Sequence, residues 1–169
     1  MKDNNIIMIG MPGSGKSTVG VVLAKTLGMD FVDVDLVICR RNGGRLQEIV
    51  DRCTHEEFLR LEAEAALTLS CRGSVIATGG SMVCSEDAMA YLKSIGTVVY
   101  IEVPFEDLTK RINNIESRGI AFREGETLAD IYAQRIPLYE KWADITVKSN
   151  NLDRIEDVVL KVKSEVDGE

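Results

Sequence analysis

The sequence predicts an α/β fold in which helices cover both faces of a parallel β-sheet. Strand-like and helix-like apolar patterns alternate along the chain. The strand-like stretches are continuously apolar, as expected for parallel strands, because helical crossovers bury such strands on both faces. The first of these strands runs into a glycine-rich loop and then into a helical pattern, which is the order of a βα unit.

The periodicity of the apolar residues places five strands and the helices between them. Short apolar runs, several of them rich in β-branched residues, predict strands over residues 6–9, 31–34, 74–78, 97–102 and 145–147. Apolar residues at helical spacing predict helices over residues 19–27, 55–69, 86–93, 105–112, 128–142 and 152–162. Two polar, glycine-containing segments, 40–51 and 113–127, interrupt the alternation and are expected to be surface loops or lids over a site.

Length and composition predict a single domain over residues 1–169. The chain has 45% hydrophobic and 28% charged residues, which is typical of a globular protein and excludes collagen-like, low-complexity and disordered classes. No apolar run approaches the roughly 20 residues that a membrane-spanning helix needs, so a cytoplasmic protein that does not enter a membrane is expected.

The net charge and the spacing of the cysteines argue against several kinds of binding partner and site. The formal charge of −7 disfavours binding of a polyanion, so no nucleic-acid partner is expected, although a small anion can still be held locally. The four cysteines are widely separated and form no C-x-x-C pair, so they predict neither a zinc site nor a redox motif. They are interpreted as buried or incidental thiols in a reducing compartment.

A phosphate-binding loop follows the first strand. Residues 10–17 read GMPGSGKS, which satisfies the pattern G-x-x-x-x-G-K-[ST] between a strand and a helix. The glycines allow successive backbone N–H groups to face a β-phosphate together with the helix N-terminus. Lys16 adds a mobile positive charge toward the β- and γ-oxygens, and Ser17 supplies a hard oxygen ligand for Mg²⁺. The pattern therefore predicts a nucleoside triphosphate site with magnesium as its cofactor.

Two further strand ends are expected beside this loop. Asp33 and Asp35 end the second strand, and two residues that are two apart on a strand share a face, so both carboxylates are expected at the phosphate edge. We assign Asp33 to the magnesium shell, through water, and Asp35 to orientation and deprotonation of an acceptor hydroxyl. A solvated strand end or a helix cap is the alternative. Gly79 and Gly80 end the third strand and permit close approach of a ligand to the backbone.

The chain resembles the shikimate kinase family over nearly its whole length. The resemblance rests on the loop 10–17, the Asp33-x-Asp35 pair, the segment 57–62 (EFLRLE), Gly79-Gly80, Arg118, and the R-x-P-L-Y motif that begins at Arg135. It implies a fold like that of P-loop nucleoside monophosphate kinases, with strand order 2-3-1-4-5. It also implies a lid over about residues 113–127 and a helical acceptor-binding segment over about residues 35–62.

The resemblance further implies an ATP-dependent phosphotransferase that acts on shikimate in aromatic amino acid biosynthesis, as a monomer with ATP and ADP as its nucleotide partners. It assigns catalytic roles to Lys16, Asp35 and Arg118. It implies a nucleotide site made of Gly13, Ser14, Gly15, Lys16, Ser17, Thr18, Arg111 and Arg118. The implied acceptor site is made of Asp35, Gly79, Gly80, Ser81 and Arg135.

The sequence departs from the family pattern in the acceptor half. Leu59 stands where the family has an arginine that binds the acceptor's carboxylate, and Arg60 lies about 100° away on the same helix. Ser81 replaces the third glycine of a Gly-Gly-Gly strand end, and Gly119 follows Arg118 where proline is usual. These departures leave open a kinase of another small alcohol, such as the hydroxy-amino acid homoserine. A nucleotide-binding regulatory protein without catalysis is the alternative from another class.

Overall fold

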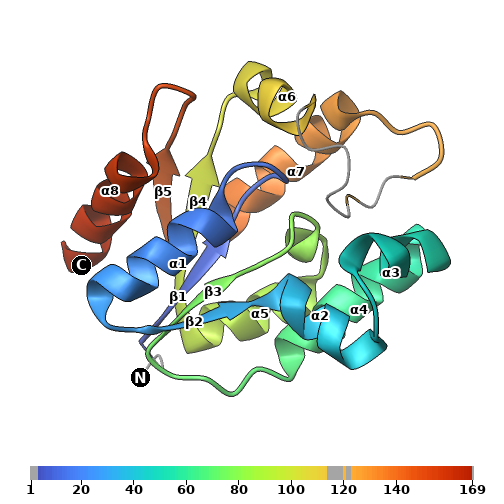
Figure 1. Ribbon diagram of the computed structural model, residues 1–169, viewed down its shortest axis with the longest axis horizontal. Helices are drawn as coiled ribbons and strands as arrows, with labels where there is room; N and C mark the ends of the chain where they lie inside the picture. Colours follow the sequence, from blue (N-terminus) through green and yellow to red (C-terminus); the bar gives the residue numbers. More distant parts are fainter. Residues whose placement is uncertain (1–3, 114–119, 121–122, 169) are drawn as a thin grey trace.

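The computed structural model describes residues 4–113, 120 and 123–168. Its centre is a five-stranded parallel sheet with the order β2-β3-β1-β4-β5, which confirms the predicted α/β class and strand order (Figure 1). The strands are β1 (Asn5–Ile9), β2 (Asp30–Asp33), β3 (Ser74–Ala77), β4 (Gly96–Glu102) and β5 (Ile145–Lys148). The strands β1, β3 and β4 are almost entirely buried, whereas β5 alternates between buried and exposed residues as an edge strand.

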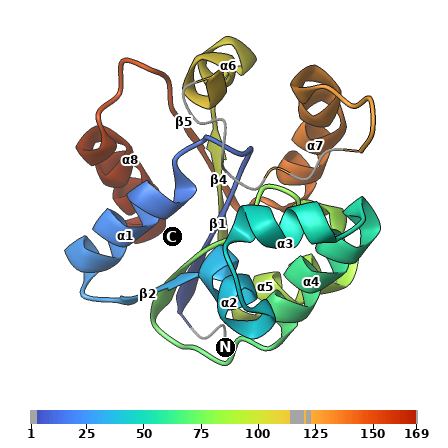
Figure 2. The same cartoon turned by 45° about the vertical axis from the view of Figure 1, so that its right-hand side comes forward.

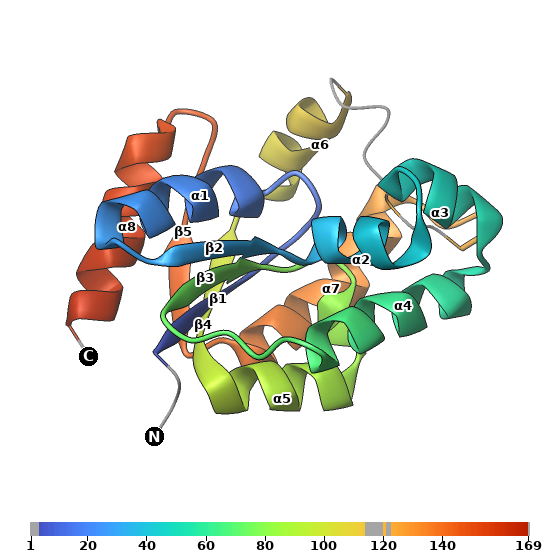
Figure 3. The ribbon, with the colours of Figure 1, turned by 60° about the horizontal axis from the view of Figure 1, so that its bottom comes forward.

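Helices cover both faces of this sheet. The helices are α1 (Lys16–Leu27), α2 (Val34–Asn42), α3 (Leu46–Arg52), α4 (His55–Leu67), α5 (Glu86–Ile95), α6 (Phe105–Asn113), α7 (Leu128–Trp142) and α8 (Ile155–Asp167), with a short 3₁₀ turn η1 (Met82–Cys84). The first and last helices, α1 and α8, pack together on one face of the sheet, and α5 and α7 lie on the other (Figure 3). Among the described helices, none is long and apolar enough to cross a membrane.

The helices α2, α3 and α4 form a group beside the sheet (Figure 2). The segment 40–51 was predicted to be a loop, and this prediction is wrong because α2 extends to Asn42 and α3 begins at Leu46. Each of these short helices is anchored by a fully buried residue near its middle, Ile38 in α2 and Ile49 in α3. One or two apolar contacts per helix are too few to produce a clear helical period in the sequence.

Helix α7 has its predicted bounds, whereas α8 begins later than predicted. Helix α7 spans the predicted residues 128–142, because Thr127 accepts from the backbone N–H of Asp130 and Asp130 in turn accepts from that of Thr127. The last helix was expected from residue 152 but begins at Ile155. Residues 150–153 instead form a turn in which Asn150 N–H donates to the Asp153 carboxylate at 3.0 Å.

Candidate active site

The loop between β1 and α1 has the geometry of an anion-binding cradle. Gly13 and Gly15 have φ values of 78° and 92°, which L side chains rarely adopt. Gly15 is the residue before α1, so the first free N–H groups of that helix open toward the loop. The predicted glycine pattern is therefore explained by the backbone conformation that it permits.

Lys16 is buried at the first position of α1, with 7% of its surface exposed. Its Nζ donates to the carbonyl oxygens of Gly10 and Met11, each at 2.8 Å. Burial lowers the pKa of the Lys16 ammonium to about 8, and the nearby charge of Asp35 opposes this shift. These two carbonyl contacts hold the ammonium inside the loop.

A cavity of about 560 Å³ opens at the carboxyl end of the sheet, where β1 and β3 lead into their loops. It brings together twelve of the predicted site residues, which are Gly13, Ser14, Gly15, Lys16, Ser17, Thr18, Asp35, Gly79, Gly80, Ser81, Arg111 and Arg135. Asp33 is not among its lining residues. Arg118 lies outside the described residues, as does most of the predicted lid 113–127.

Asp33 and Asp35 do not share a strand face, so that part of the sequence argument is wrong. Strand β2 ends at Asp33, and Asp35 lies in the first turn of α2. Asp33 caps this helix, since its Oδ1 accepts from the backbone N–H of Asp35 at 2.9 Å. The helical turn directs Asp35 into the cavity, where burial and the neighbouring charge of Asp33 raise its pKa to about 6.

Gly79 and Gly80, just after the end of β3, line the part of the cavity in which the acceptor is expected. A Cβ on Gly79 would collide with the Glu62 carboxyl group, so the absence of a side chain lets α4 approach the backbone here. The carbonyl oxygen of Gly80 accepts from the hydroxyl of Tyr139 at 2.5 Å. Tyr139 is fully buried and stacks on Tyr100 of β4, so the strand end is held between the sheet and α7.

Glu62 is a site residue to which the sequence analysis assigned no role. It lies on α4, is 2% exposed, and lines the cavity. Its carboxyl accepts a hydrogen bond from the hydroxyl of Ser81, and burial raises its pKa to about 7. The available signal was its place at the end of the segment 57–62, which is one of the segments that carry the resemblance to the family.

Arg135 supplies the positive charge on the acceptor side. It lies in the middle of α7, with 4% of its surface exposed. Its guanidinium opposes the burial-induced increase in the pKa of Tyr139 one helical turn later and of the Cys84 thiol. Among the described residues, no carboxylate forms an ion pair with Arg135. A planar fork of donors in a cavity is suited to bidentate binding of a carboxylate.

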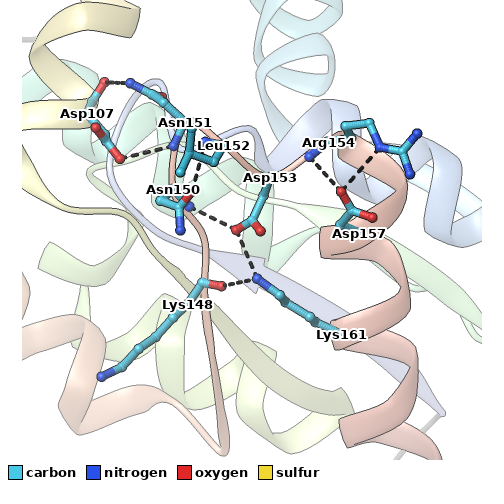
Figure 4. A network of polar contacts seen from close by, with 9 residues as sticks. All are labelled: Asp107, Lys148, Asn150, Asn151, Leu152, Asp153, Arg154, Asp157 and Lys161. Atoms are coloured by element: carbon cyan, nitrogen blue, oxygen red, sulfur yellow. Dashed lines mark hydrogen bonds and ion pairs between the residues drawn. The ribbon is translucent and has the colours of Figure 1, made fainter.

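Arg111 links α6 to the phosphate loop. Its Nη1 lies 3.4 Å from the carbonyl oxygen of Gly13 and 3.3 Å from that of Ser14, and its Nε donates to Asn151 at 2.7 Å. Figure 4 shows Asn151 held by Asp107, which accepts from the Asn151 backbone N–H at 3.0 Å. The guanidinium plane is therefore fixed from two sides at the outer wall of the cavity.

The loop 149–154 completes this outer wall and is ordered by its own polar contacts. Asp153 accepts from the Asn150 N–H and from Nζ of Lys161 at 2.9 Å, while Asp157 accepts from the Arg154 N–H at 2.9 Å (Figure 4). These contacts tie the loop to the first two turns of α8. The nucleotide half thus includes a wall that the sequence analysis did not assign, because its residues form no local motif.

Comparison with known proteins places the whole chain in one family. The model of the shikimate kinase family matches residues 12–167. A shikimate kinase of Aquifex aeolicus is 34% identical over 164 residues, which cover 96% of both sequences. A solved shikimate kinase of Acinetobacter baumannii, in complex with shikimate, superposes with a TM-score of 0.89 at 30% identity, covering 98% of this chain and 93% of that one.

The same sequence pattern also occurs inside a larger protein. Threonine synthase-like 1 of Homo sapiens is 35% identical over 162 residues, which are 95% of this chain but 22% of that protein. The likeness is therefore confined to one part of that protein. In contrast, the matches to the bacterial shikimate kinases above extend over nearly the full length of both partners. The chain belongs to the shikimate kinase family.

Proposed function

We propose that the protein transfers the γ-phosphoryl group of ATP to a hydroxyl of shikimate, forming shikimate 3-phosphate for aromatic amino acid biosynthesis. The observation that carries this proposal is a single cavity that joins a phosphate-binding loop to a buried arginine and an acidic side chain. The bound shikimate in the related Acinetobacter structure supports the same acceptor. Arg135 would bind the carboxylate of the acceptor, and Gly79 and Gly80 would present backbone groups to it.

The reaction is an in-line displacement at the γ-phosphorus. Asp35 orients the acceptor hydroxyl and takes up its proton as the new O–P bond forms and the bond to the β–γ bridging oxygen breaks. Lys16 balances the charge on the phosphate oxygens. The proposed catalytic role of Arg118 follows from the resemblance, with its guanidinium closing over the transferred group as part of the lid.

The residues around the loop fit a magnesium ion. Ser17 lines the cavity at the start of α1, and Asp33 lies close enough for its charge to act on Lys16. Magnesium in phosphoryl-transfer sites takes most of its ligands from phosphates and waters, so one hydroxyl and one water-bridged carboxylate are sufficient protein donors. The ion would neutralise charge on the triphosphate. Ser17 would bind it directly and Asp33 through water.

We further propose that residues 1–169 act as one cytoplasmic domain and as a monomer. Both halves of the cavity come from the same chain, so a second copy is not needed to complete the site.

A coupled assay of ADP release tests the proposal. The purified protein would be supplied with MgATP and either shikimate or a panel of hydroxy acids and hydroxy-amino acids, including homoserine. Saturable turnover with shikimate is the expected result. Turnover with a panel member while shikimate is inert would refute the proposed acceptor, and ATP hydrolysis that no acceptor accelerates would refute the kinase.

Replacing Leu59 with arginine is expected to lower KM for shikimate about tenfold. Leu59 lies three residues before Glu62 and thus on the same side of α4, so an arginine there adds a second cation near the carboxylate of the acceptor. An added charge-assisted hydrogen bond contributes about 1.5 kcal/mol or more, which corresponds to this factor. Steady-state kinetics measure it, with Leu67→Arg at an exposed position of α4 as the control. An unchanged or higher KM would contradict the expectation.

Replacing Asn151 with alanine is expected to raise KM for ATP about fivefold while kcat stays within about twofold. The variant removes the 2.7 Å contact that holds Arg111 Nε at the outer wall of the cavity. A lost hydrogen bond of about 1 kcal/mol gives this effect. The control is Asn42→Ala, an exposed asparagine at the end of α2. An equal change of KM for ATP in both variants would contradict the prediction, because it would show that the positioning of Arg111 by Asn151 does not affect nucleotide affinity.

A further inference from the structure

The buried carboxyl group of Glu62 is shared between two elements of the acceptor side. Its Oε2 accepts from the hydroxyl of Ser81, the residue before η1, and its Oε1 lies against Gly79. Ser81 is itself 5% exposed, so this hydrogen bond is screened from water. Glu62 is the only charged residue among the buried residues of α4, and the serine hydroxyl therefore fixes its orientation.

Titratable groups from other elements of the cavity act on the Glu62 carboxyl. They are the carboxyl of Asp35, the ammonium of Lys16, the guanidinium of Arg135 and the thiol of Cys84. Of the two cations, the charge of Arg135 lowers the pKa of Glu62 more strongly than that of Lys16 does. Neither forms an ion pair with Glu62 in the described part of the chain.

Arg135 is thus the alternative partner for the Glu62 carboxylate, in place of the Ser81 hydroxyl. Both side chains are at least nine-tenths buried and line the same cavity. Opposite charges attract strongly where water is excluded, and a buried carboxylate that loses a hydrogen bond takes another partner. If Glu62 turned toward Arg135, its oxygens would occupy the donors that an acceptor carboxylate requires. The hydrogen bond from Ser81 is the described contact that holds Glu62 in its other orientation.

We propose that Ser81 is a positioning residue which holds Glu62 away from Arg135 and so keeps the guanidinium available for the carboxylate of the acceptor. The proposal rests on the proposed function and deepens it. Ser81 acts here through Glu62 rather than by contact with the reacting atoms.

The central test is the Ser81→Ala variant, assayed for shikimate and for ATP over pH 6 to 8. KM for shikimate is expected to rise about tenfold near pH 8, while KM for ATP and kcat stay within about twofold. Only the ionised Glu62 competes for Arg135, so the increase is expected to shrink as pH falls from 8 to 6, because burial raises the pKa of the Glu62 carboxyl and the variant lacks the Ser81 hydrogen bond that opposes this shift. An unchanged KM for shikimate at pH 8, or an increase independent of pH, would overturn the proposal.

A double variant separates positioning from a loss of structure. Glu62→Gln removes the competing charge, so Ser81→Ala combined with Glu62→Gln is expected to restore KM for shikimate to within about threefold of the wild type. A double variant as impaired as Ser81→Ala alone would overturn the proposal. Ser94→Ala, an exposed serine of α5, is the control. If the wild type itself does not use shikimate, the proposed function fails, and that outcome is distinct from a failure of the Ser81 effect.

Discussion

Replacing Asp35 with asparagine is expected to lower kcat about a thousandfold while KM for ATP changes less than about twofold. Asparagine keeps the size of the side chain and one acceptor oxygen, but it cannot take up a proton from the acceptor hydroxyl. Loss of a general base costs about two to four orders of magnitude in rate. Asp35 lines the cavity from the first turn of α2, and among the described residues its side chain forms no hydrogen bond with the loop 10–17, so the nucleotide contacts of that loop are expected to remain. Steady-state kinetics of ADP release measure both parameters.

The pH profile identifies the group that is lost. Burial raises the pKa of Asp35 to about 6, so the carboxylate form is present above that pH and is lost as pH falls through it. The wild-type kcat/KM for shikimate is expected to fall on this acidic limb, and Asp35→Asn is expected to lack the limb. Asp30→Asn, at the exposed start of β2, is the matched control and should keep the wild-type kcat and profile. If Asp35→Asn kept more than a tenth of the wild-type kcat, Asp35 would not be the group that takes up the proton.

The three central strands, β1, β3 and β4, were predictable from sequence because they are short, largely apolar and buried. Strand β3, for example, was expected over residues 74–78 and spans Ser74–Ala77, with every residue buried. The helices α2 and α3 were not predicted as separate elements. They are nine and seven residues long, respectively, are separated by a turn that contains Gly43 and Gly44, and bury few side chains, so their stability comes from packing against α4 rather than from a local pattern.

The phosphate-binding loop was predictable because its backbone geometry is encoded in consecutive residues. The loop 10–17 carries the strand end, the glycines, Lys16 and the helix start in one segment. The Glu62–Ser81 pair could not be found in this way, because it joins residues 19 apart on two elements. The turn that directs Asp35 into the cavity was also missed, since the Asp33 cap ends β2 two residues before Asp35. Contacts between elements depend on packing, which a local pattern does not encode.

Replacing Lys16 with methionine is expected to lower kcat about a thousandfold and to raise the melting temperature of the protein without nucleotide. Methionine fills a similar volume to the aliphatic part of lysine but provides no charge for the phosphate oxygens. Removal of a positioned donor to the transferred group costs about two to three orders of magnitude. The matched control is Lys25→Met, an exposed lysine on the same helix, for which near-wild-type kinetics and stability are expected.

The gain in stability follows from the same burial that makes Lys16 useful. The pKa of Lys16 lies near 8 in the folded protein, below its ordinary 10.5, so the charged form is disfavoured by folding. Removing that charge relieves the penalty, and a melting temperature at or below the wild-type value would contradict this.

The basic limb of the pH profile of activity gives an independent check on the role of Lys16. Above about pH 8 the free protein loses the ammonium, so kcat/KM for ATP is expected to fall there. In contrast, kcat should stay level, because the negative charge of the bound triphosphate raises the pKa of Lys16 and keeps it protonated.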